Sequence, residues 1–460
     1  MDTRAVIVTD ISYGDAGKGT TVDYLVRQAA AAAVIRHNGG SQAAHNVITP
    51  GGRHHTFAQF GSGSFVSGTR THLSRHMLVN PLNMFPEAEH LESLGVRGVW
   101  ARTTVDRDAL VITPWQCSAN QLRELARGAG RHGSCGQGIG ETMADSLAHP
   151  DLVLHVRDIQ SNSLHAKLSR LRAYKLSQLR DEQLHNLDGL PSTERQALLD
   201  PLLIDSIEYL YREWAERVQI VDGSYLKFLA RQHELLVFEG AQGVLLDEWY
   251  GFHPYTTWST TTHANAMDLL REQDFDGEIT RMGVLRAYTT RHGAGPFVSE
   301  DRSLASDLAE RHNGLDDWQG AFRYGHLDLL AHQYALAACG ATDELVMTGL
   351  DRLQALPTWN ICDGYRLVGY HPDADRFFTF GPNGTIAAIK LGIQGDLDHQ
   401  ERLGQLLASC SPVYHSIRSS DTFQESIHGY LHTVEDRLGL PITITSFGPT
   451  AADKRSRVMR

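Results

Sequence analysis

Apolar and polar positions follow a clear order at the start of the chain. Residues 5–8 are apolar and β-branched apart from one alanine, which predicts a short buried strand. Residues 20–26 place apolar positions at helical spacing, with Thr20 or Thr21 as the predicted N-cap residue. The loop between them contains, in order, Gly14, Asp15, Gly17, Lys18 and Gly19. The pattern therefore predicts a strand, a glycine-rich loop and a helix in succession.

Short apolar runs end in glycine together with Asp, Gln, Thr or Arg at several later points. These runs cover residues 33–36, 235–238, 282–288, 345–347 and 442–445. In open parallel sheets, ligands bind beyond the carboxyl ends of the strands. One such loop alone is compatible with a plain connection, whereas the repetition predicts one extended binding site.

Residues 162–234 differ in composition from the rest of the chain. Glycine and β-branched residues become sparse, while Leu, Arg, Lys, Glu and Gln dominate. Apolar residues here follow helical spacing, as at Leu203, Ile207, Leu210 and Tyr211. No linker, repeat or low-complexity tract divides the chain. We therefore predict an α/β fold in which residues 1–460 form one domain with a large, mostly parallel central sheet and residues 162–234 form a helical excursion.

Composition narrows the classes of function. The chain has 460 residues, 42% of them hydrophobic, as in soluble globular proteins. Its net charge of −12 gives no overall attraction for nucleic acid or an anionic membrane. Five scattered cysteines without a C-x-x-C pair favour reduced thiols over disulfides or a zinc site. No signal-peptide pattern is present, and the apolar run at residues 29–35 is too short to span a bilayer. We expect a cytoplasmic protein without a nucleic-acid or membrane partner.

The first glycine-rich loop has the composition of a phosphate site. Glycine N–H groups, a helix N-terminus and a lysine all favour an anion. The spacing differs from that of a Walker A loop, because two residues separate Gly14 from Gly17 and Gly19 follows Lys18. The alternative is a glycine-rich turn with a surface lysine. Asp15 favours the phosphate site, because a carboxylate beside phosphates usually serves a metal ion or a proton transfer.

Two further polar loops also leave alternatives open. Residues 37–46 contain His45, which in isolation is best interpreted as a loop histidine bonded to nearby backbone. Residues 133–140 contain four glycines. Such a segment indicates either the close approach of a ligand to the backbone or a flexible connection.

Seven segments, in this order, resemble the motifs of the adenylosuccinate synthetase family. They are GDAGKG at 14–19, GGSQAAH at 39–45, FEGAQG with LLD at 238–247, PYTT with STT at 254–261, YTTRHGAGPF at 288–297, TGLD at 348–351 and SFGP at 446–449. The resemblance implies an α/β fold with a P-loop-like GTP-binding loop. It also implies a carbon–nitrogen ligase of purine biosynthesis that uses GTP and Mg²⁺ to join L-aspartate to IMP through a 6-phosphoryl intermediate. Such enzymes are homodimers.

The resemblance also implies a role for individual residues. Asp15 would be the base, Lys18 would stabilise the transferred phosphoryl group, His45 would act as acid or charge stabiliser, and Gln242 would hold the reacting amide edge. The implied nucleotide-binding residues are Gly14, Gly17, Lys18, Gly19, Thr20, Asp351, Ser446 and Gly448. The implied acceptor-binding residues are Gln42, Cys135, Gln242 and Thr257. The implied amine-binding residues are Thr289, Arg291 and Arg323, and the implied metal ligands are Asp15 and Ala44.

Departures from the family motifs cluster in the substrate pockets. Gln42 replaces an Asn and Cys135 replaces a Thr in the loops that hold the acceptor phosphate. His149 lies in the region of an arginine that crosses between subunits, and Arg323 alone remains of an arginine run in the aspartate loop. Gly349 replaces the base-recognition Lys, which leaves ATP as an alternative to GTP.

These departures leave two other functions open. One is a paralogue that uses a different acceptor or amine, in nucleotide modification or specialised metabolism. The other is a nucleotide-binding regulator without turnover. Retention of Asp15, Lys18, His45 and Gln242 favours an enzyme, because a binding module does not need a base paired with an acid.

Overall fold

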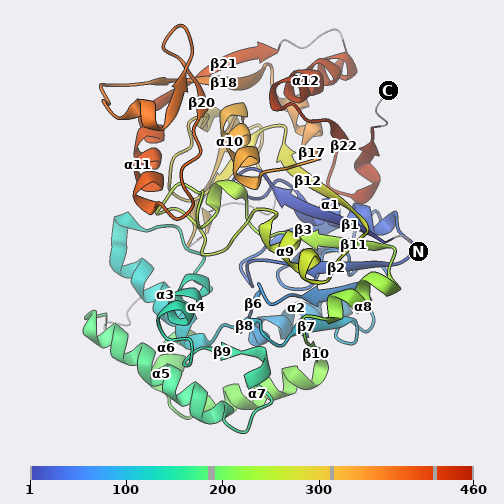
Figure 1. Cartoon of the computed structure of the whole chain (residues 1–460), viewed down its shortest axis with the longest axis vertical. Helices are drawn as coiled ribbons and strands as arrows, with labels where there is room; N and C mark the ends of the chain where they lie inside the picture. Colours follow the sequence, from blue (N-terminus) through green and yellow to red (C-terminus); the bar gives the residue numbers. More distant parts are fainter. Residues whose placement is uncertain (1–2, 185–191, 311–314, 317, 418–421, 458–460) are drawn as a thin grey trace.

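A ten-stranded sheet runs through the middle of the molecule (Figure 1). The computed structural model describes residues 3–184, 192–310, 315–316, 318–417 and 422–457. Neighbouring strands are parallel except for the last pair, so the predicted mostly parallel α/β sheet is confirmed. The strand order is β10 (Gln219–Val221), β7 (Thr103–Asp106), β5 (Arg70–Leu73), β2 (Ala32–Arg36), β11 (Leu235–Glu239), β1 (Arg4–Asp10), β12 (Glu278–Arg286), β17 (Glu344–Thr348), β22 (Ile442–Ser446) and β23 (Lys454–Ser456).

Both faces of the central strands are buried, as their continuous apolar runs predict. Val6 and Val8 pack on one face with helix α1 (Lys18–Arg27). Ala5 and Ile7 point to the other face, where they pack with helices α8 (Tyr225–Gln232) and α9 (Ala264–Glu272). This alternation fixes the register of β1 between β11 and β12.

Helix α1 begins earlier than the sequence predicts. Its N-cap residue is Gly17, in the left-handed conformation with φ 96°. The prediction of Thr20 or Thr21 as N-cap is wrong, because the chain turns from loop to helix at a glycine that adopts this conformation without strain. Thr21 lies in the first turn, where its hydroxyl donates to the Gly17 carbonyl at 2.9 Å.

A group of helices occupies one end of the long axis (Figure 1). Helices α5, α6 and α7 pack here with α2 and α3 in one hydrophobic cluster that contains Trp115 and Trp214. Residues 162–234 therefore contain helices, but they also contain β10, the edge strand of the central sheet. The helices are α2 (Pro81–Ser93), α3 (Pro114–Arg127), α4 (Ile139–Ala148), α5 (Leu164–Asp181), α6 (Ser192–Leu199) and α7 (Leu203–Arg217).

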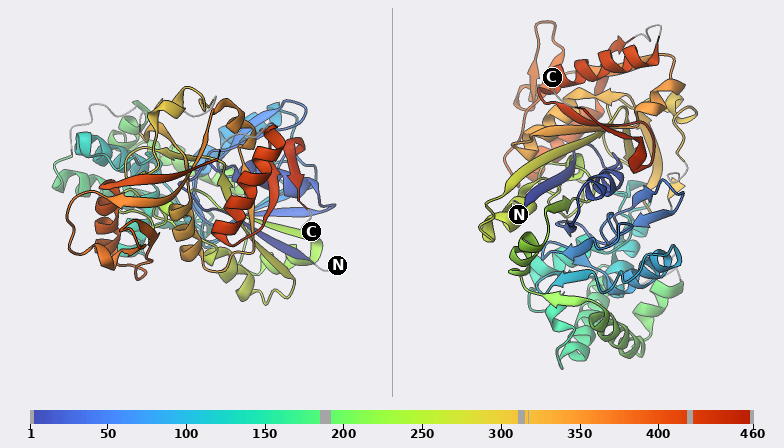
Figure 2. Two further views of the ribbon diagram at one scale, coloured as in Figure 1. Left: turned by 90° about the horizontal axis from the view of Figure 1, so that it is seen from above. Right: turned by 90° about the vertical axis from the view of Figure 1, so that its right-hand side faces the viewer.

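A second, smaller sheet lies at the opposite end of the long axis (Figure 1, Figure 2). It is covered by three helices and shares their hydrophobic core. Its strands are β16 (Leu327–Asp328), β18 (Trp359–Leu367), β19 (Phe378–Phe380), β20 (Ile386–Ile389) and β21 (Cys410–Ile417). The helices are α10 (Leu329–Cys339), α11 (Leu397–Ala408) and α12 (Phe423–Leu438).

Short strands and 3₁₀ helices lie within the connections between the larger elements. The strands are β3 (His45–Ile48), β4 (His54–Phe57), β6 (Leu78–Val79), β8 (Leu110–Val111), β9 (Leu154–His155), β13 (Thr289–His292), β14 (Leu315–Asp316) and β15 (Gly320–Gly325). The 3₁₀ helices are η1 (Gly128–Gly130), η2 (Val156–Asp158), η3 (Val244–Leu246), η4 (Arg302–Ala305), η5 (Leu350–Ala355), η6 (Ala374–Arg376) and η7 (Ala451–Asp453).

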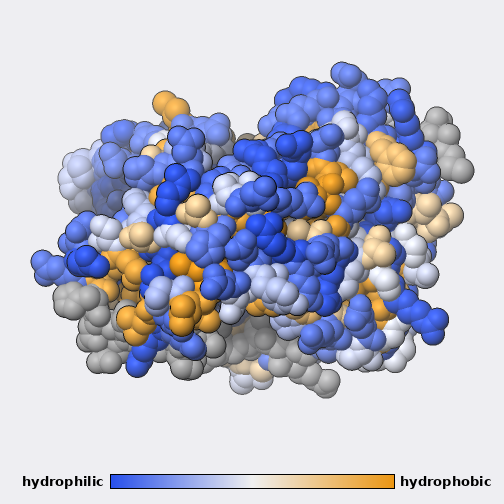
Figure 3. Space-filling model, turned by 90° about the horizontal axis from the view of Figure 1, so that it is seen from below, coloured by the Kyte–Doolittle hydropathy of each residue, from blue (hydrophilic) through white to orange (hydrophobic). Residues whose placement is uncertain are grey.

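The surface at the helical end is mostly hydrophilic, with hydrophobic residues in small separate groups (Figure 3). No helix within the described ranges is long and apolar enough to cross a membrane.

Candidate active site

The loop after β1 holds its lysine inside the protein. Lys18 is only 3% exposed, and its Nζ donates to Asp10 Oδ2 at 3.0 Å. The same carboxylate accepts the backbone N–H groups of Ser12 and Ala16, each at 2.9 Å. The alternative of a turn with a surface lysine is therefore wrong. Asp10 fixes both the curvature of the loop and the position of the ammonium group.

Asp15 lies in this loop with φ 60°. Its side chain is 30% exposed, and Oδ2 lies 3.6 Å from Nε2 of His292. Its carbonyl oxygen accepts from Nε of Arg286 at 2.5 Å. The backbone is thus held by β12 while the carboxylate remains open to a ligand.

His45 is bonded to a buried carboxylate rather than to nearby backbone. Its Nδ1 lies 2.6 Å from Oε1 of Glu239, the last residue of β11. Ser62 also donates its backbone N–H to Glu239, at 3.0 Å. Burial alone would raise the pKa of Glu239, but Arg36, His45 and Ser62 lower it to about 2. A permanently ionised carboxylate on Nδ1 orients the ring and fixes its tautomer.

Two glutamine side chains approach Gly39, in the loop that follows β2. The Oε1 atom of Gln242 and both amide atoms of Gln42 are buried without a partner among the described residues. A Cβ placed on Gly39 would lie 3.1 Å from Gln242 Oε1 and 3.3 Å from Gln42 Nε2. The two loops are also joined by hydrogen bonds of 2.8 and 3.0 Å between Asn38 and the backbone of Ala241. Unsatisfied amides in this position suit a ligand that presents a polar edge.

The third loop, residues 133–138, is anchored rather than loosely connected. The Oδ1 atom of Asn120 accepts from the Ser134 hydroxyl at 2.9 Å and from the Gly138 N–H at 3.3 Å. The Oε1 atom of Gln137 accepts from Ser41 Oγ at 3.1 Å and from Asn83 Nδ2 at 2.9 Å. These bonds tie the third loop to the second.

The other residues predicted near the acceptor do not all lie at this loop. Cys135 is half-buried within it. Thr257 is half-buried as well and donates its N–H to the Leu246 carbonyl at 2.8 Å. His149 lies at the other end of α4 from the loop, with its ring 4.9 Å from that of Tyr174.

The residues predicted to bind the amine lie on two paired strands, where Arg291 of β13 is opposite Arg323 of β15. Arg291 is 1% exposed and donates to the carbonyls of Ala294 and Pro296 at 3.0 and 2.8 Å, so it shapes the loop. Burial lowers its pKa to about 10. Arg323 pairs with Glu300 and lines an open hollow of about 610 Å³.

The residues predicted to bind the nucleotide converge from three segments. Thr20 Oγ1 donates to the Pro449 carbonyl at 3.1 Å, and Ser446 Oγ donates to the Gly448 carbonyl at 2.9 Å. Asp351 follows β17 in η5 and is half-buried, which raises its pKa. Phosphate and base contacts can therefore come from one continuous surface.

Sequence reasoning missed the partners that hold these groups. Asp10 and Glu239 are carboxylates that end buried strands, a signal that could have found them. His292 lies within the segment at 288–297, but no role was predicted for it, and Lys454 lies outside all seven segments.

The donor set fits one magnesium ion that is held mainly by nucleotide phosphates. Mg²⁺ typically takes one or two carboxylates together with phosphate oxygens and waters. Asp15 offers such a carboxylate, and Ala44 is exposed and can offer only its carbonyl. No group of three or more His, Cys, Asp or Glu suited to a metal occurs in the described part of the chain.

Comparison with known proteins identifies the family of the chain. A family model for adenylosuccinate synthetase matches residues 7–455. The adenylosuccinate synthetase of Ralstonia nicotianae is 30% identical over 470 residues, covering 97% of this chain and 95% of that protein. That of Neisseria gonorrhoeae is 28% identical over 464 residues, covering 97% and 96%.

Two solved structures share the fold. The fully ligated adenylosuccinate synthetase from Plasmodium falciparum has a TM-score of 0.75 and 19% identity, covering 98% of this chain and 99% of that one. The succinoaminodeoxyadenylate synthetase of cyanophage S-2L, bound to dGMP and to dATP as an energy donor, has a TM-score of 0.58 and 15% identity, covering 99% and 96%. Because the family match spans nearly all of the sequence, this chain belongs to the adenylosuccinate synthetase family.

Proposed function

We propose that this chain is a GTP-dependent carbon–nitrogen ligase that joins L-aspartate to a purine nucleotide of the IMP type, with release of GDP and phosphate. The observation that carries the proposal is the arrangement of Lys18 and His45. Each is buried and bonded to a buried carboxylate at the end of a central strand. Asp15 lies in the same loop as Lys18 with its carboxylate accessible. This provides a base and two charge-stabilising groups around one phosphate loop.

The first chemical step is transfer of the γ-phosphoryl group to the 6-oxygen of the acceptor. Asp15 takes the N1 proton, so that negative charge moves onto the 6-oxygen. That oxygen attacks the γ-phosphorus, and the electron pair of the broken P–O bond leaves with GDP. Lys18 stabilises charge on the phosphoryl oxygens, and His45 does so in its protonated form, in which Nε2 also carries a hydrogen. A bound Mg²⁺ would neutralise phosphate charge, with Asp15 and the Ala44 carbonyl as the residues to hold it.

The second step replaces the new phosphate ester with an amine. The neutral amino group of aspartate attacks C6, phosphate leaves with the electron pair of the C–O bond, and the departing phosphate takes up the proton that the nitrogen loses. Arg323 lines the hollow between β15 and η4. Glu300 and the carbonyls of Gly293 and Gly295 hold most of its N–H groups, so a substrate carboxylate there would meet the remaining N–H of Nη2 or displace Glu300. The hydroxyl of Thr289 is buried without a partner among the described residues, which suits a ligand contact. Arg291 would act indirectly, by shaping the loop.

The same geometry argues against a regulator without turnover. A nucleotide-binding module gains from Lys18 and the glycines, but it gains nothing from His45 held against Glu239. Family membership further supports a cytoplasmic homodimer that uses Mg²⁺ and small-molecule substrates.

The test is phosphate release from GTP and Mg²⁺, with and without IMP and L-aspartate. We expect release only with both, together with formation of adenylosuccinate. Asp15→Asn should lower turnover by at least about 10²-fold while GDP binding persists. Turnover that survives this substitution would show that Asp15 is not the base. Absence of release by the unmodified protein would refute the IMP and aspartate pair and call for other purine nucleotides, including dGMP.

A further inference from the structure

Lys454 is a buried lysine in the nucleotide region that no motif of the sequence includes. It is the first residue of β23, and its side chain is 6% exposed. Its Nζ donates to Thr20 Oγ1 at 2.7 Å and to Ser446 Oγ at 3.2 Å. Both hydroxyls belong to residues for which the family resemblance implies contact with the nucleotide. The ammonium group therefore sits where the phosphate helix meets the loop after β22.

The hydrogen-bond partners of Lys454 are unusual for a buried cation. An ammonium group has three N–H donors, and the described partners are two neutral hydroxyls. Burial lowers the pKa of Lys454 to about 8, while the carboxylates of Asp23, Asp453 and Asp351 oppose this shift. A buried charge without a direct ion pair is costly, so the site favours an additional acceptor from a ligand.

Position 349 cannot supply a cation to the same region. Gly349 has φ 69°, and an added Cβ would lie 3.1 Å from the ring of Tyr288. A lysine there would be strained and would have to displace that ring. The TGLD segment thus contributes the carboxylate of Asp351 but no positive charge. Lys454 brings the positive charge from the last strand of the sheet instead.

We propose that Lys454 selects guanine in the nucleotide site by donating to its 6-oxygen, beside Asp351, which the family resemblance already implies as the acceptor of the N1–H and 2-amino groups. This inference rests on the proposed function, because it identifies how the GTP of that reaction is recognised. Guanine presents an acceptor at position 6 and donors at positions 1 and 2. Adenine presents a donor at position 6 and an acceptor at position 1, so it meets both charged groups with the wrong polarity.

The experiment compares nucleotides that differ only at the base. The values of kcat/KM are measured with GTP, ITP, 6-thio-GTP and ATP for the unmodified protein and for Lys454→Met. ITP keeps the 6-oxygen and the N1–H, whereas 6-thio-GTP replaces the 6-oxygen with a weakly accepting sulfur. A hydrogen bond to a charged group corresponds to about 10- to 100-fold in affinity. We therefore expect Lys454→Met to lose about 10- to 100-fold with GTP and ITP, but less than about 3-fold with 6-thio-GTP and ATP.

A matched control is Lys227→Met, which removes an exposed ammonium group on α8 at the other face of the sheet. It should leave all four values unchanged. The KM values for IMP and L-aspartate should also remain unchanged in Lys454→Met, because the lysine does not face their pockets.

An equal loss with all four nucleotides would overturn the proposal, since it would make Lys454 only a strut between Thr20 and Ser446. An unchanged KM for GTP would overturn it as well. If Lys454→Met does not fold, Lys454→Gln keeps a neutral donor and should show a smaller loss with the same order among the nucleotides. Calorimetry on the unmodified protein separates the two proposals. Equal binding of GDP and 6-thio-GDP would refute the role of Lys454 but leave the proposed function intact. Absence of any GDP binding would refute the proposed function itself.

Discussion

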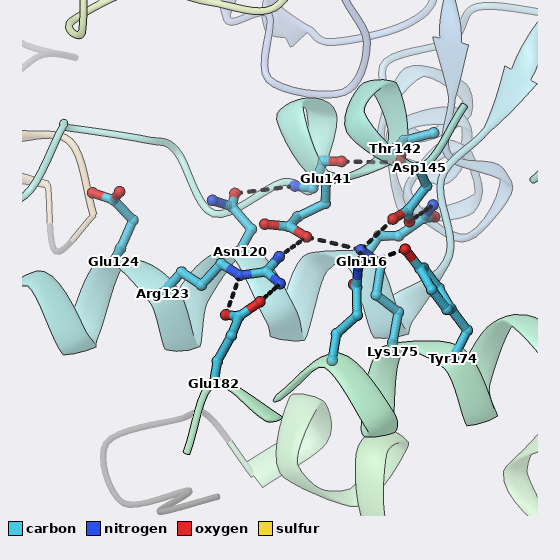
Figure 4. Close-up of polar contacts among 12 residues, drawn as sticks. Gln116, Asn120, Arg123, Glu124, Glu141, Thr142, Asp145, Tyr174, Lys175 and Glu182 are labelled. Carbon is cyan, nitrogen blue, oxygen red and sulfur yellow. Dashed lines mark hydrogen bonds and ion pairs between the residues drawn. The ribbon is translucent and has the colours of Figure 1, made fainter. Parts of the chain in front are cut away.

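Replacing Lys175 by methionine should destabilise the protein through one specific carboxylate. Lys175 is 1% exposed on α5, and its Nζ contacts Asp145 at 2.6 Å and Glu141 at 2.9 Å, both on α4 (Figure 4). Glu141 keeps a second cation, Arg123, when Lys175 is removed. Asp145 is 2% exposed, and within the described part of the chain its remaining side-chain partner is the amide of Gln116, at 3.0 Å. The cost therefore falls mainly on Asp145.

The magnitude follows from this difference between the two acids. Removing one partner of a buried ion pair costs about 3–5 kcal/mol, and the lower end applies because Glu141 remains paired. Unfolding of 460 residues as one unit has an entropy of about 1 kcal/mol/K near 60 °C. Lys175→Met should therefore lower Tm by about 3 °C. Burial already raises the pKa of Asp145, and loss of its cation raises it further. Stability lost in this way is recovered as the pH falls and Asp145 takes up a proton, so the deficit should be smaller at pH 5 than at pH 7.

The assay is urea unfolding and thermal melting of four proteins that form a cycle. They are the unmodified chain, Lys175→Met, Asp145→Asn and the double variant. The double variant should regain most of the lost stability, because it no longer buries an unpaired charge. A double variant as unstable as the sum of the two single variants would refute the reasoning. So would a deficit that is the same at pH 5 and pH 7.

Three further predictions concern the site and the core. Glu239→Gln should lower kcat by about 10²-fold or more with little change in the KM for GTP, because His45 loses the carboxylate that orients it. Steady-state kinetics measures both values, and an unchanged kcat would contradict the prediction. Gly17→Ala and Gly95→Ala both place a side chain at positive φ, and each should lower the free energy of unfolding in urea by about 1–2 kcal/mol. Only Gly17→Ala should also raise the KM for GTP, and equal effects of the two substitutions on that KM would contradict the prediction. Burial lowers the pKa of His72 to about 4, so its contribution to stability is complete above its unfolded pKa of about 6.5 and falls by about 2 kcal/mol at pH 5. His72→Gln should remove that part of the pH dependence, and an unchanged slope of unfolding free energy against pH would refute the prediction.

The central sheet was predictable because its strands carry their own signal. Each of β1, β2 and β11 is an apolar run that is buried on both faces and ends in a glycine-containing loop. The second sheet was not predicted. Its longest strand, β18, reads WNICDGYRL, and its buried positions include Trp359 and Ile361 among polar residues. Such a strand is defined by its pairing with β21, and this long-range contact leaves no local pattern.

Site residues were predictable where a local sequence pattern contains them, as for the strands of the central sheet. Loop residues such as Asp15 and Lys18 stand within recognisable motifs. The contacts that hold them, such as the bond between His45 and Glu239, join residues that are distant in the chain. Lys454 entered the nucleotide region only because β23 folds back antiparallel onto β22, which places it opposite Ser446.

Residues 162–234 rejoin the central sheet as strand β10, and this pairing limits which deletions the chain can tolerate. β10 pairs with β7 through residues 219–221 and covers the last parallel strand on that side. An excision that rejoins the chain beyond β10 would leave the backbone N–H and C=O groups of β7 as an open edge, and such edges pair with other chains. The excursion therefore cannot be removed whole. A shortened variant must keep residues 219–221 paired in register with β7, because without them the exposed edge would make the protein aggregate.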